Sequence, residues 1–239
     1  MSEPTAPVLA IDIETATLES ARDDNVDFQD TQSFDLVAVG LGYRQHGDAP
    51  IESTVCFRRG RWSLEATTEL LRDVIIWTEQ RPANATLTYN GKQFDAIHLR
   101  EWARRAAKEG LWPEAVDRFD ELFTEHIDLA RAAMERYGHM LERNRSGIRL
   151  DLLCEWEQID TPTIRFDAYA LDDLEVVQSI DDDTISGRHV GKYLGEAYID
   201  RSHTAPDSRQ TKALEAILRD YTRGDIEPLF KLADSFDVV

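Results

Sequence analysis

Two acidic residues stand close together near the start of the chain, in Asp12-Ile13-Glu14. They end an apolar stretch, residues 8–14, whose composition is typical of a buried strand. Because side chains two residues apart on a strand point to the same face, both carboxylates project together. Such a pair is unfavourable unless something neutralises it, and a divalent cation with oxygen ligands would do so. The alternative is that the strand ends in water at Glu14.

A second acidic motif is Asn90-Gly-Lys-Gln-Phe94-Asp95. The short strand expected at residues 85–89 ends in an Asn-Gly turn, and Asp95 opens the helix that follows. A carboxylate at this position is often only a capping group, and Phe94 alone would be a core residue.

The third motif is Tyr221-Thr-Arg-Gly-Asp225, on the last expected helix. Residues four apart share one helical face, so Tyr221 and Asp225 lie in register with the apolar stripe of that helix. An unpaired buried aspartate there would be unfavourable. The alternative is an aspartate at the edge of the stripe whose carboxylate reaches solvent.

In this order, the three motifs resemble the tyrosine-type DEDD exonucleases of the ribonuclease H-like superfamily. The resemblance is greatest to the 3′→5′ exonuclease domain of family B DNA polymerases and its stand-alone relatives. It runs from about residue 8 to residue 233 and includes similar segments at 127–129 and 185–187. It implies an α/β, ribonuclease H-like fold with a central five-stranded mixed sheet flanked by helices.

The same resemblance implies a catalytic set of five residues. Asp12, Glu14, Asp95 and Asp225 would bind two divalent cations, and Tyr221 would position the attacking water or help to deprotonate it. Mg²⁺ or Mn²⁺ suits these oxygen ligands, whereas zinc prefers histidine and cysteine. The expected reaction is 3′→5′ hydrolysis of DNA or RNA phosphodiester bonds from single-stranded or frayed ends, with release of nucleoside monophosphates.

Substrate contacts are expected from Asn90, Lys92 and Phe94 of the second motif. Lys92 is the best phosphate contact because its loop lies beside the metal ligands. Phe94 could wedge against the terminal base, although core packing is favoured. Further candidates are three arginine clusters: Arg58, Arg59 and Arg61; Arg100, Arg104 and Arg105; and Arg143 and Arg145. The alternative for each arginine is a solvated surface residue paired with an acidic neighbour, and structural roles are favoured for His98 and Asp128.

The periodicity of the chain predicts the elements that position these motifs. The remaining strands are expected at residues 35–43, 51–57 and 127–129. The helices are expected at 64–79 with Ser63 as N-cap, 94–108, 114–126 and 209–236, with helical pieces between 130 and 195. Pro228 should kink or break the last helix, with part of its steric clash relieved by Gly224. We expect one domain over 1–239, with an acidic loop near 19–34 and a helical insertion near 130–205.

The chain has 239 residues and a formal net charge of −19, with only five lysines among its 27 basic residues. This charge argues against binding nucleic acid by bulk electrostatics alone, but it is compatible with binding through metal ions and a few local arginines. Acidic excess with scarce lysine favours a high-salt cell interior over an ordinary cytoplasm.

Neither a signal peptide nor a membrane span is predicted, so a cytoplasmic location is expected. Two distant cysteines exclude a disulfide framework. Two alternatives to the nuclease hypothesis stay open: a catalytically silent nucleic-acid-binding or scaffold subunit on the same fold, and an acidic α/β protein with accidental motifs. The sequence identifies no protein partner.

Overall fold

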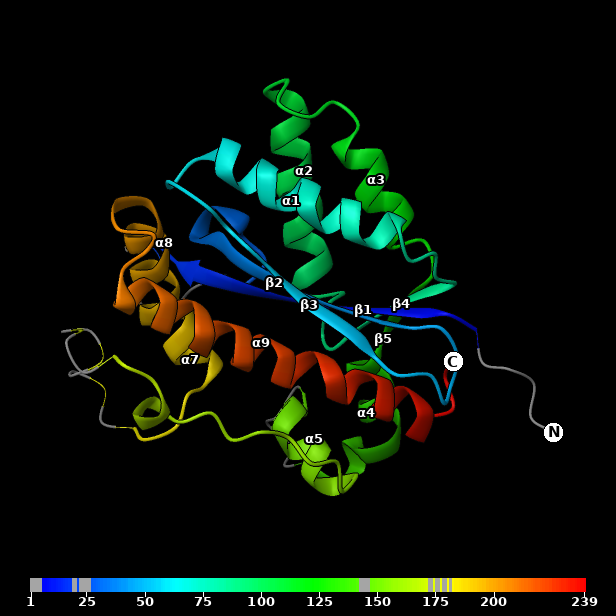
Figure 1. The fold of residues 1–239 in the computed structure, drawn as a ribbon. Helices are drawn as coiled ribbons and strands as arrows, with labels where there is room; N and C mark the ends of the chain where they lie inside the picture. The colour runs from blue at the N-terminus through cyan, green and yellow to red at the C-terminus, as the bar shows by residue number, and fades with distance from the viewer. Residues whose placement is uncertain are drawn as a thin grey trace.

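A computed structural model describes residues 6–18, 21, 27–141, 147–171, 174, 177, 180 and 182–239. One five-stranded sheet in the order β3-β2-β1-β4-β5 crosses the molecule (Figure 1). Its strands are β1 (Val8–Thr17), β2 (Phe34–Arg44), β3 (Glu52–Phe57), β4 (Ala85–Thr88) and β5 (His126–Asp128). β1 is antiparallel to β2 and parallel to β4, so the sheet is mixed, and the expected strands and meander are confirmed.

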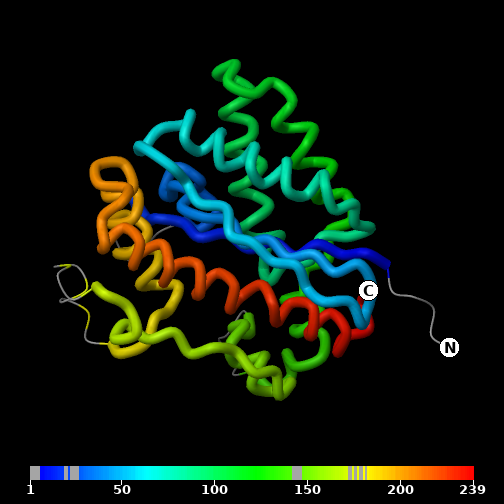
Figure 2. The backbone as a smooth tube through the Cα atoms, in the orientation of Figure 1, coloured from blue at the N-terminus to red at the C-terminus, as the bar shows by residue number. Residues whose placement is uncertain are grey.

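Helices cover both faces of the sheet. On one face lie α1 (Leu64–Glu79), α2 (Asp95–Lys108) and α3 (Ala115–Leu122); on the other lies α9 (Arg209–Ser235). Figure 2 shows α9, in orange to red, running along the strands on the side away from α1 and α2. The Ser63 hydroxyl accepts a hydrogen bond from the Ala66 N–H, which confirms Ser63 as the N-cap of α1.

Successive side chains of β1 point to opposite faces of the sheet, so its two isoleucines and its two carboxylates lie on different faces. Ile11 and Ile13 are buried in the cluster formed with α1 and α2. Asp12 and Glu14 therefore face the α9 side of the sheet, as the period of two requires. The register of β1 against β2 shifts between Glu14 and Thr15, so an irregularity in the strand pairing directly follows the two carboxylates.

Two glycines of β2 set how closely α9 approaches the sheet. A Cβ atom at Gly40 would lie 2.5 Å from Thr222 Cγ2, and one at Gly42 would lie 2.7 Å from Phe230 Cε2. Real Cβ atoms do not come this close to other heavy atoms. Side chains at these two positions would therefore push α9 away from β1.

Of the kink or break expected at Pro228, the break is wrong. α9 is one helix of 27 residues with Pro228 inside it and buried. Gly224 stands four residues before Pro228, where a larger residue would worsen the clash with the proline ring. A Cβ at Gly224 would also lie 3.1 Å from Pro162 Cγ, so the absent side chain leaves room for a neighbouring segment.

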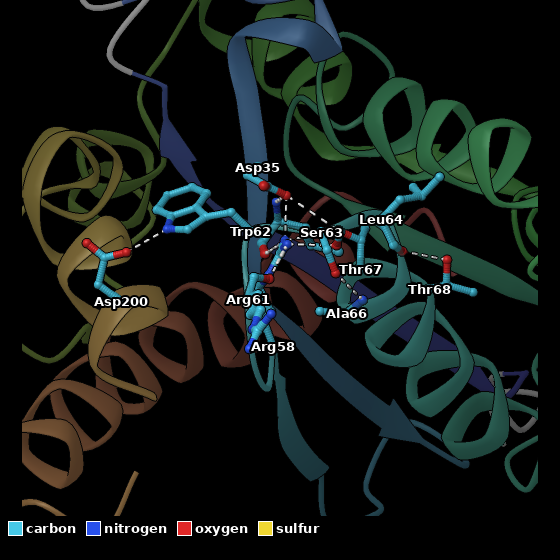
Figure 3. A network of polar contacts seen from close by, with 11 residues as sticks. Asp35, Arg58, Arg61, Trp62, Ser63, Leu64, Ala66, Thr67, Thr68 and Asp200 are labelled. Atoms are coloured by element: carbon cyan, nitrogen blue, oxygen red, sulfur yellow. Dashed lines mark hydrogen bonds and ion pairs between the residues drawn. The ribbon is translucent and has the colours of Figure 1, made fainter. Parts of the chain in front are cut away.

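Arg58, expected on the surface as a phosphate contact or a solvated residue, is instead 0% exposed. Its guanidinium forms an ion pair with Asp35 and donates to Thr67 Oγ1 and to the carbonyls of Leu36, Arg61 and Ser63 (Figure 3). These bonds fasten the loop between β3 and α1 to β2. The charge is buried because every N–H group of the fork has an acceptor.

The segment after β5 contains α4 (Leu129–Tyr137), a 3₁₀ turn (Gly138–Met140), α5 (Leu150–Trp156), a second 3₁₀ turn (Phe166–Ala168), α7 (Gly187–His189), a π-helical turn (Val190–Leu194) and α8 (Gly195–Thr204). A further 3₁₀ turn, Thr31–Ser33, precedes β2. Some expectations lie outside the described residues: Arg143 and Arg145, and Glu19, Asp23 and Asp24 of the acidic loop.

Candidate active site

Three carboxylates from two distant parts of the chain meet between β1 and α9. Asp12, Glu14 and Asp225 each offer an oxygen, and these oxygens all lie within 4.8 Å of one another. Glu14 is 6% exposed, whereas Asp12 and Asp225 keep part of their surface accessible. We call these three residues the carboxylate cluster. Their spacing is compatible with shared coordination of a cation by oxygen ligands.

Asp95 lies beside the carboxylate cluster and is 4% exposed. It is the first residue of α2, but its Oδ1 accepts a hydrogen bond of 3.0 Å from the Ile13 N–H of β1. This bond fixes the start of α2 to the strand that carries Asp12 and Glu14. The carboxylate is therefore tied to β1, which a capping role alone would not do.

All four carboxylates hold protons more tightly than usual. Burial, followed by the charges of Glu14, Asp95 and Asp225, raises the pKa of Asp12 well above its ordinary value. Burial and the charge of Asp225 do the same for the pKa of Glu14. The pKa of Asp95 rises to about 7, mainly through burial, although hydrogen bonds from backbone N–H groups oppose the shift. The pKa of Asp225 also rises to about 7, mainly through burial.

Among the residues that the structure describes, no lysine, arginine or histidine forms an ion pair with these carboxylates. Four mutually repelling carboxylates without a cationic neighbour are unfavourable when ionised. Divalent cations such as Mg²⁺ or Mn²⁺ would remove this repulsion, and carboxylate oxygens are the ligands that they prefer. The residues present therefore fit a divalent metal site.

Tyr221 completes the site from α9, one helical turn before Asp225. Its hydroxyl lies beside the Asp225 carboxylate and lowers the pKa of Asp225 against the effect of burial. Burial and the charge of Asp225 raise the pKa of Tyr221 far above its ordinary value. The phenol is thus a neutral hydrogen-bonding group at neutral pH.

The second motif forms a tight turn that Asp128 holds in place. Asn90 has a φ of 62°, and a Cβ at Gly91 would lie 2.4 Å from Thr88 Oγ1, so this turn requires glycine at position 91. The Asp128 carboxylate accepts hydrogen bonds from the N–H groups of Asn90 (2.8 Å) and Lys92 (2.9 Å). It also accepts one from Ala130 and caps α4, so the structural role expected for Asp128 is confirmed.

Comparison with solved structures gives a match over nearly the whole chain. The family B DNA polymerase of the hyperthermophilic archaeon Pyrobaculum calidifontis matches 98% of this chain with a TM-score of 0.51 and 18% identity. The fold is ribonuclease H-like. This chain spans 25% of the length of that polymerase.

Two further matches cover less of the chain. Cell-death related nuclease 4 (CRN-4) matches 66% of this chain and 57% of its own, with 9% identity and a TM-score of 0.42. Exonuclease I of E. coli, solved with an oligonucleotide, matches 65% of this chain and 36% of its own, with 14% identity and a TM-score of 0.40. No model of a protein family matches the sequence, and no curated protein does.

The other residues expected to contact substrate differ from one another in exposure and in their partners. Lys92 is exposed at the turn, whereas Phe94 is partly buried and packs edge-on against Phe34 and His98. Arg100 is paired with Asp120 at 2.8 Å, and Arg104 and Arg105 share Glu101 at 2.6 and 3.4 Å. Pairing with acidic neighbours, the alternative stated for these arginines, is thus observed.

His98 has the structural role that the sequence favoured. It is 0% exposed, donates from Nε2 to the Phe28 carbonyl at 2.9 Å and accepts at Nδ1 from the Thr31 hydroxyl at 2.7 Å. Burial lowers its pKa, so the ring is neutral with both nitrogens occupied.

The sequence analysis missed two contributors to the site. Thr222 Oγ1 lies 3.3 Å from Glu14 Oε1 and lowers the pKa of Glu14 against the effect of burial. Gly187 approaches the Tyr221 hydroxyl so closely that a Cβ there would lie 3.3 Å from it. A polar residue inside the apolar stripe of α9 was a usable signal for Thr222, whereas nothing in the sequence linked residue 187 to Tyr221.

No helix within the described residues is long and apolar enough to cross a membrane.

Proposed function

We propose that this chain is a metal-dependent 3′→5′ exonuclease that hydrolyses phosphodiester bonds of DNA or RNA and releases nucleoside monophosphates. The observation that carries this proposal is the carboxylate cluster, whose oxygens lie within 4.8 Å of one another. Carboxylates this close together repel one another when ionised, and a bound divalent cation would remove that repulsion. The ribonuclease H-like fold supports the proposal, because its central strand presents Asp12 and Glu14 beside the helix that carries Asp225.

In this proposal, Asp12, Glu14, Asp95 and Asp225 hold two divalent cations, Mg²⁺ or Mn²⁺. When bound, the two cations would activate the attacking water and neutralise the developing charge on the leaving oxygen. Asp95 keeps α2 docked on β1 through the Ile13 N–H, so it positions the second motif as well.

Tyr221 has the role of orienting the water. Its raised pKa makes the phenol a poor base at neutral pH but a stable hydrogen-bond donor and acceptor. The phenol lies beside the Asp225 carboxylate, next to the proposed metal ligands. Asn90, Lys92 and Phe94 directly precede α2, and in this proposal they contact the terminal nucleotide of a single-stranded or frayed end.

The experiment is to incubate the protein with 5′-labelled single-stranded DNA and RNA and Mn²⁺, at low and at high salt. A ladder of products that shortens from the 3′ end is expected, together with a preference between the two sugars. The high-salt arm also tests whether the acidic composition suits a high-salt cell interior. The matched variant is Asp12→Asn, which removes a ligand charge with little change in shape.

Thermal unfolding separates the nuclease from a catalytically silent scaffold. Mn²⁺ should raise the melting temperature of the wild type but not of Asp12→Asn. Loss of the ladder in Asp12→Asn also excludes a contaminating nuclease. Metal stabilisation with intact labelled strands would support the scaffold instead, and absence of both effects would refute the metal site.

A further inference from the structure

A groove of about 730 Å³ runs along α2 on the face of the sheet opposite to α9. Its walls are residues 29–32, one side of α2, and Phe123, Thr124 and His126. Lys92 and Ala96 line one end, on either side of Asp95 in the sequence, so the groove begins where α2 meets the proposed active site. Arg104 and Arg105, between two and three turns along the helix, line the other end.

The lining of this groove is basic although the chain is strongly acidic. Four basic side chains, Lys92, Arg100, Arg104 and Arg105, line the groove with two acidic ones, Asp30 and Glu101, in a chain of net charge −19. Arg100 is paired with Asp120, which does not line the groove. Arg104 and Arg105 share the single carboxylate of Glu101, which leaves one positive charge in excess there. Within the described residues, the Lys92 ammonium has no ion-pair partner.

The geometry and charge of α2 suit a phosphate backbone. Arg100 and Arg104 are four residues apart, hence about 6 Å apart along the helix axis. This step is of the order of the distance between neighbouring phosphates of an extended strand. The positive surroundings also act on His126: its pKa falls to about 4, first through burial and then through the charge of Lys92.

An exposed aromatic ring, that of Phe28, lies next to the groove. Phe28 is 65% exposed and stacks on Phe34 with ring centroids 6.0 Å apart and an angle of 23°. Its backbone is held by the buried His98, which binds the Phe28 carbonyl. The next residue, Gln29, lines the groove and donates to Gln93 of the second motif.

Phe28 therefore offers an exposed aromatic face beside the basic side chains of the groove. A basic groove with an aromatic platform at its edge is the combination that binds single-stranded nucleic acid. We propose that this groove binds the single strand leading to the scissile phosphate, with Lys92, Arg100 and Arg104 on phosphates and Phe28 stacked on a base. This inference rests on the proposed function and adds a binding surface remote from the four carboxylates.

The test measures binding without hydrolysis, by fluorescence anisotropy of labelled single-stranded DNA in the presence of EDTA. Arg104→Gln should weaken binding and lower the salt dependence of log Kd by about 0.7, the value for one phosphate contact of a single strand. Phe28→Ala should weaken binding about tenfold through lost stacking. Matched controls are Arg131→Gln, an exposed arginine paired within α4, and Met140→Ala, another exposed apolar residue.

Two further arms separate stacking from general attraction of anions. Phe28→Leu keeps an apolar side chain against Phe34 but has no aromatic face, so it should bind as weakly as Phe28→Ala. Inorganic polyphosphate should compete poorly with single-stranded DNA for the wild type. Equal competition, or full binding by Phe28→Leu, would overturn the stacking role of Phe28.

Activity distinguishes failure of the groove from failure of the proposed function. If the chain is an exonuclease, Arg104→Gln should lower kcat/KM for a long strand relative to a dinucleotide, whereas Arg131→Gln should not change this ratio. Wild-type binding that depends on Arg104 and Phe28, without hydrolysis of any substrate, would refute the exonuclease and keep the groove. Hydrolysis with unchanged binding and ratio in the variants would refute the groove and keep the exonuclease.

Discussion

The Arg58 guanidinium and the carboxylate cluster are both withdrawn from solvent, yet their surroundings differ. Arg58 is enclosed by acceptors, namely Asp35, the Thr67 hydroxyl and backbone carbonyls (Figure 3). In the carboxylate cluster, by contrast, Glu14 has one weak donor, Thr222, and its neighbours have the same charge as itself. A buried charge whose hydrogen bonds are all satisfied stabilises the fold. A buried charge that is surrounded by like charges instead indicates a candidate binding site for a ligand.

The largest expected effect comes from a neutral residue inside the cluster. Asp225→Asn should reduce hydrolysis by more than about 100-fold, because even an outer-shell partner of a metal ligand contributes about 10–100-fold. The same variant should unfold at a higher temperature than the wild type without metal, since a buried negative charge is gone. Rate assays and calorimetry in EDTA measure both.

Glu227→Gln is the matched control for Asp225→Asn, as an exposed residue two positions further on α9. It should change neither the rate nor the melting temperature appreciably. If Asp225→Asn destabilised the metal-free protein, the cluster would be structural like Arg58 and the contrast would fail.

Arg58→Met should destabilise the protein, whereas Asp225→Asn should stabilise the metal-free protein. It leaves Asp35 and several carbonyls without their donor, so the free energy of unfolding should fall by about 3–5 kcal/mol. Urea unfolding measures this change, with the exposed neighbour in Arg59→Met as the control. Stability equal to that of the wild type would mean that the Arg58 network does not hold the fold.

Metal and pH should act together on the cluster. Asp95 and Asp225 have a pKa of about 7 in the folded chain against an ordinary value of 3.8, so the folded state binds more protons than the unfolded state between these values. The stability of the metal-free protein should therefore fall as pH rises from about 4 to about 7.

Mn²⁺ at about 100-fold above its Kd should restore about 2.7 kcal/mol. The gain should be largest above pH 7, where Asp95 and Asp225 are ionised. Melting curves with and without Mn²⁺ across this pH range, for the wild type and Asp225→Asn, isolate the effect. A metal-free protein that gains stability as pH rises, relative to the variant, would contradict the sign.

The smallest expected effect sharpens the role of the phenol. Tyr221→Phe removes the hydroxyl beside Asp225, so kcat should fall about tenfold, less than the roughly 100- to 10,000-fold typical of a general acid or base, with little change in KM. The pKa of Asp225 should rise further, because the Tyr221 hydroxyl lowers it. A pH–rate profile that keeps its shape would assign Tyr221 to packing alone.

The sequence predicted the fold where local signals were strong. The apolar stretches predicted all five strands, and Ser63 stands at the beginning of α1, as its capping preference requires. The break at Pro228 was wrong because a local steric rule was outweighed by burial of the proline against the core.

Arg58 could not be assigned from sequence alone. Its neighbours Arg59 and Arg61 are exposed, and the three arginines look alike until their partners from β2 and α1 are known. The shared direction of Asp12 and Glu14 was anticipated from their spacing, and their convergence with Asp225 from the resemblance. The groove along α2 was not anticipated, because the sequence does not show that His98 bonds residues 28 and 31.

The absence of side chains at Gly40 and Gly42 affects the geometry of the carboxylate cluster. They lie one strand away from Asp12 and touch no reacting group, yet they fix the depth at which α9 rests on the sheet. A methyl group added at either position would push α9 away from the sheet. The distance from Asp225 on α9 to Asp12 and Glu14 on β1 would then increase, although none of the three carboxylates is changed. If the proposed cations bind there, the distances between their carboxylate ligands depend on two glycines that lie outside the site itself.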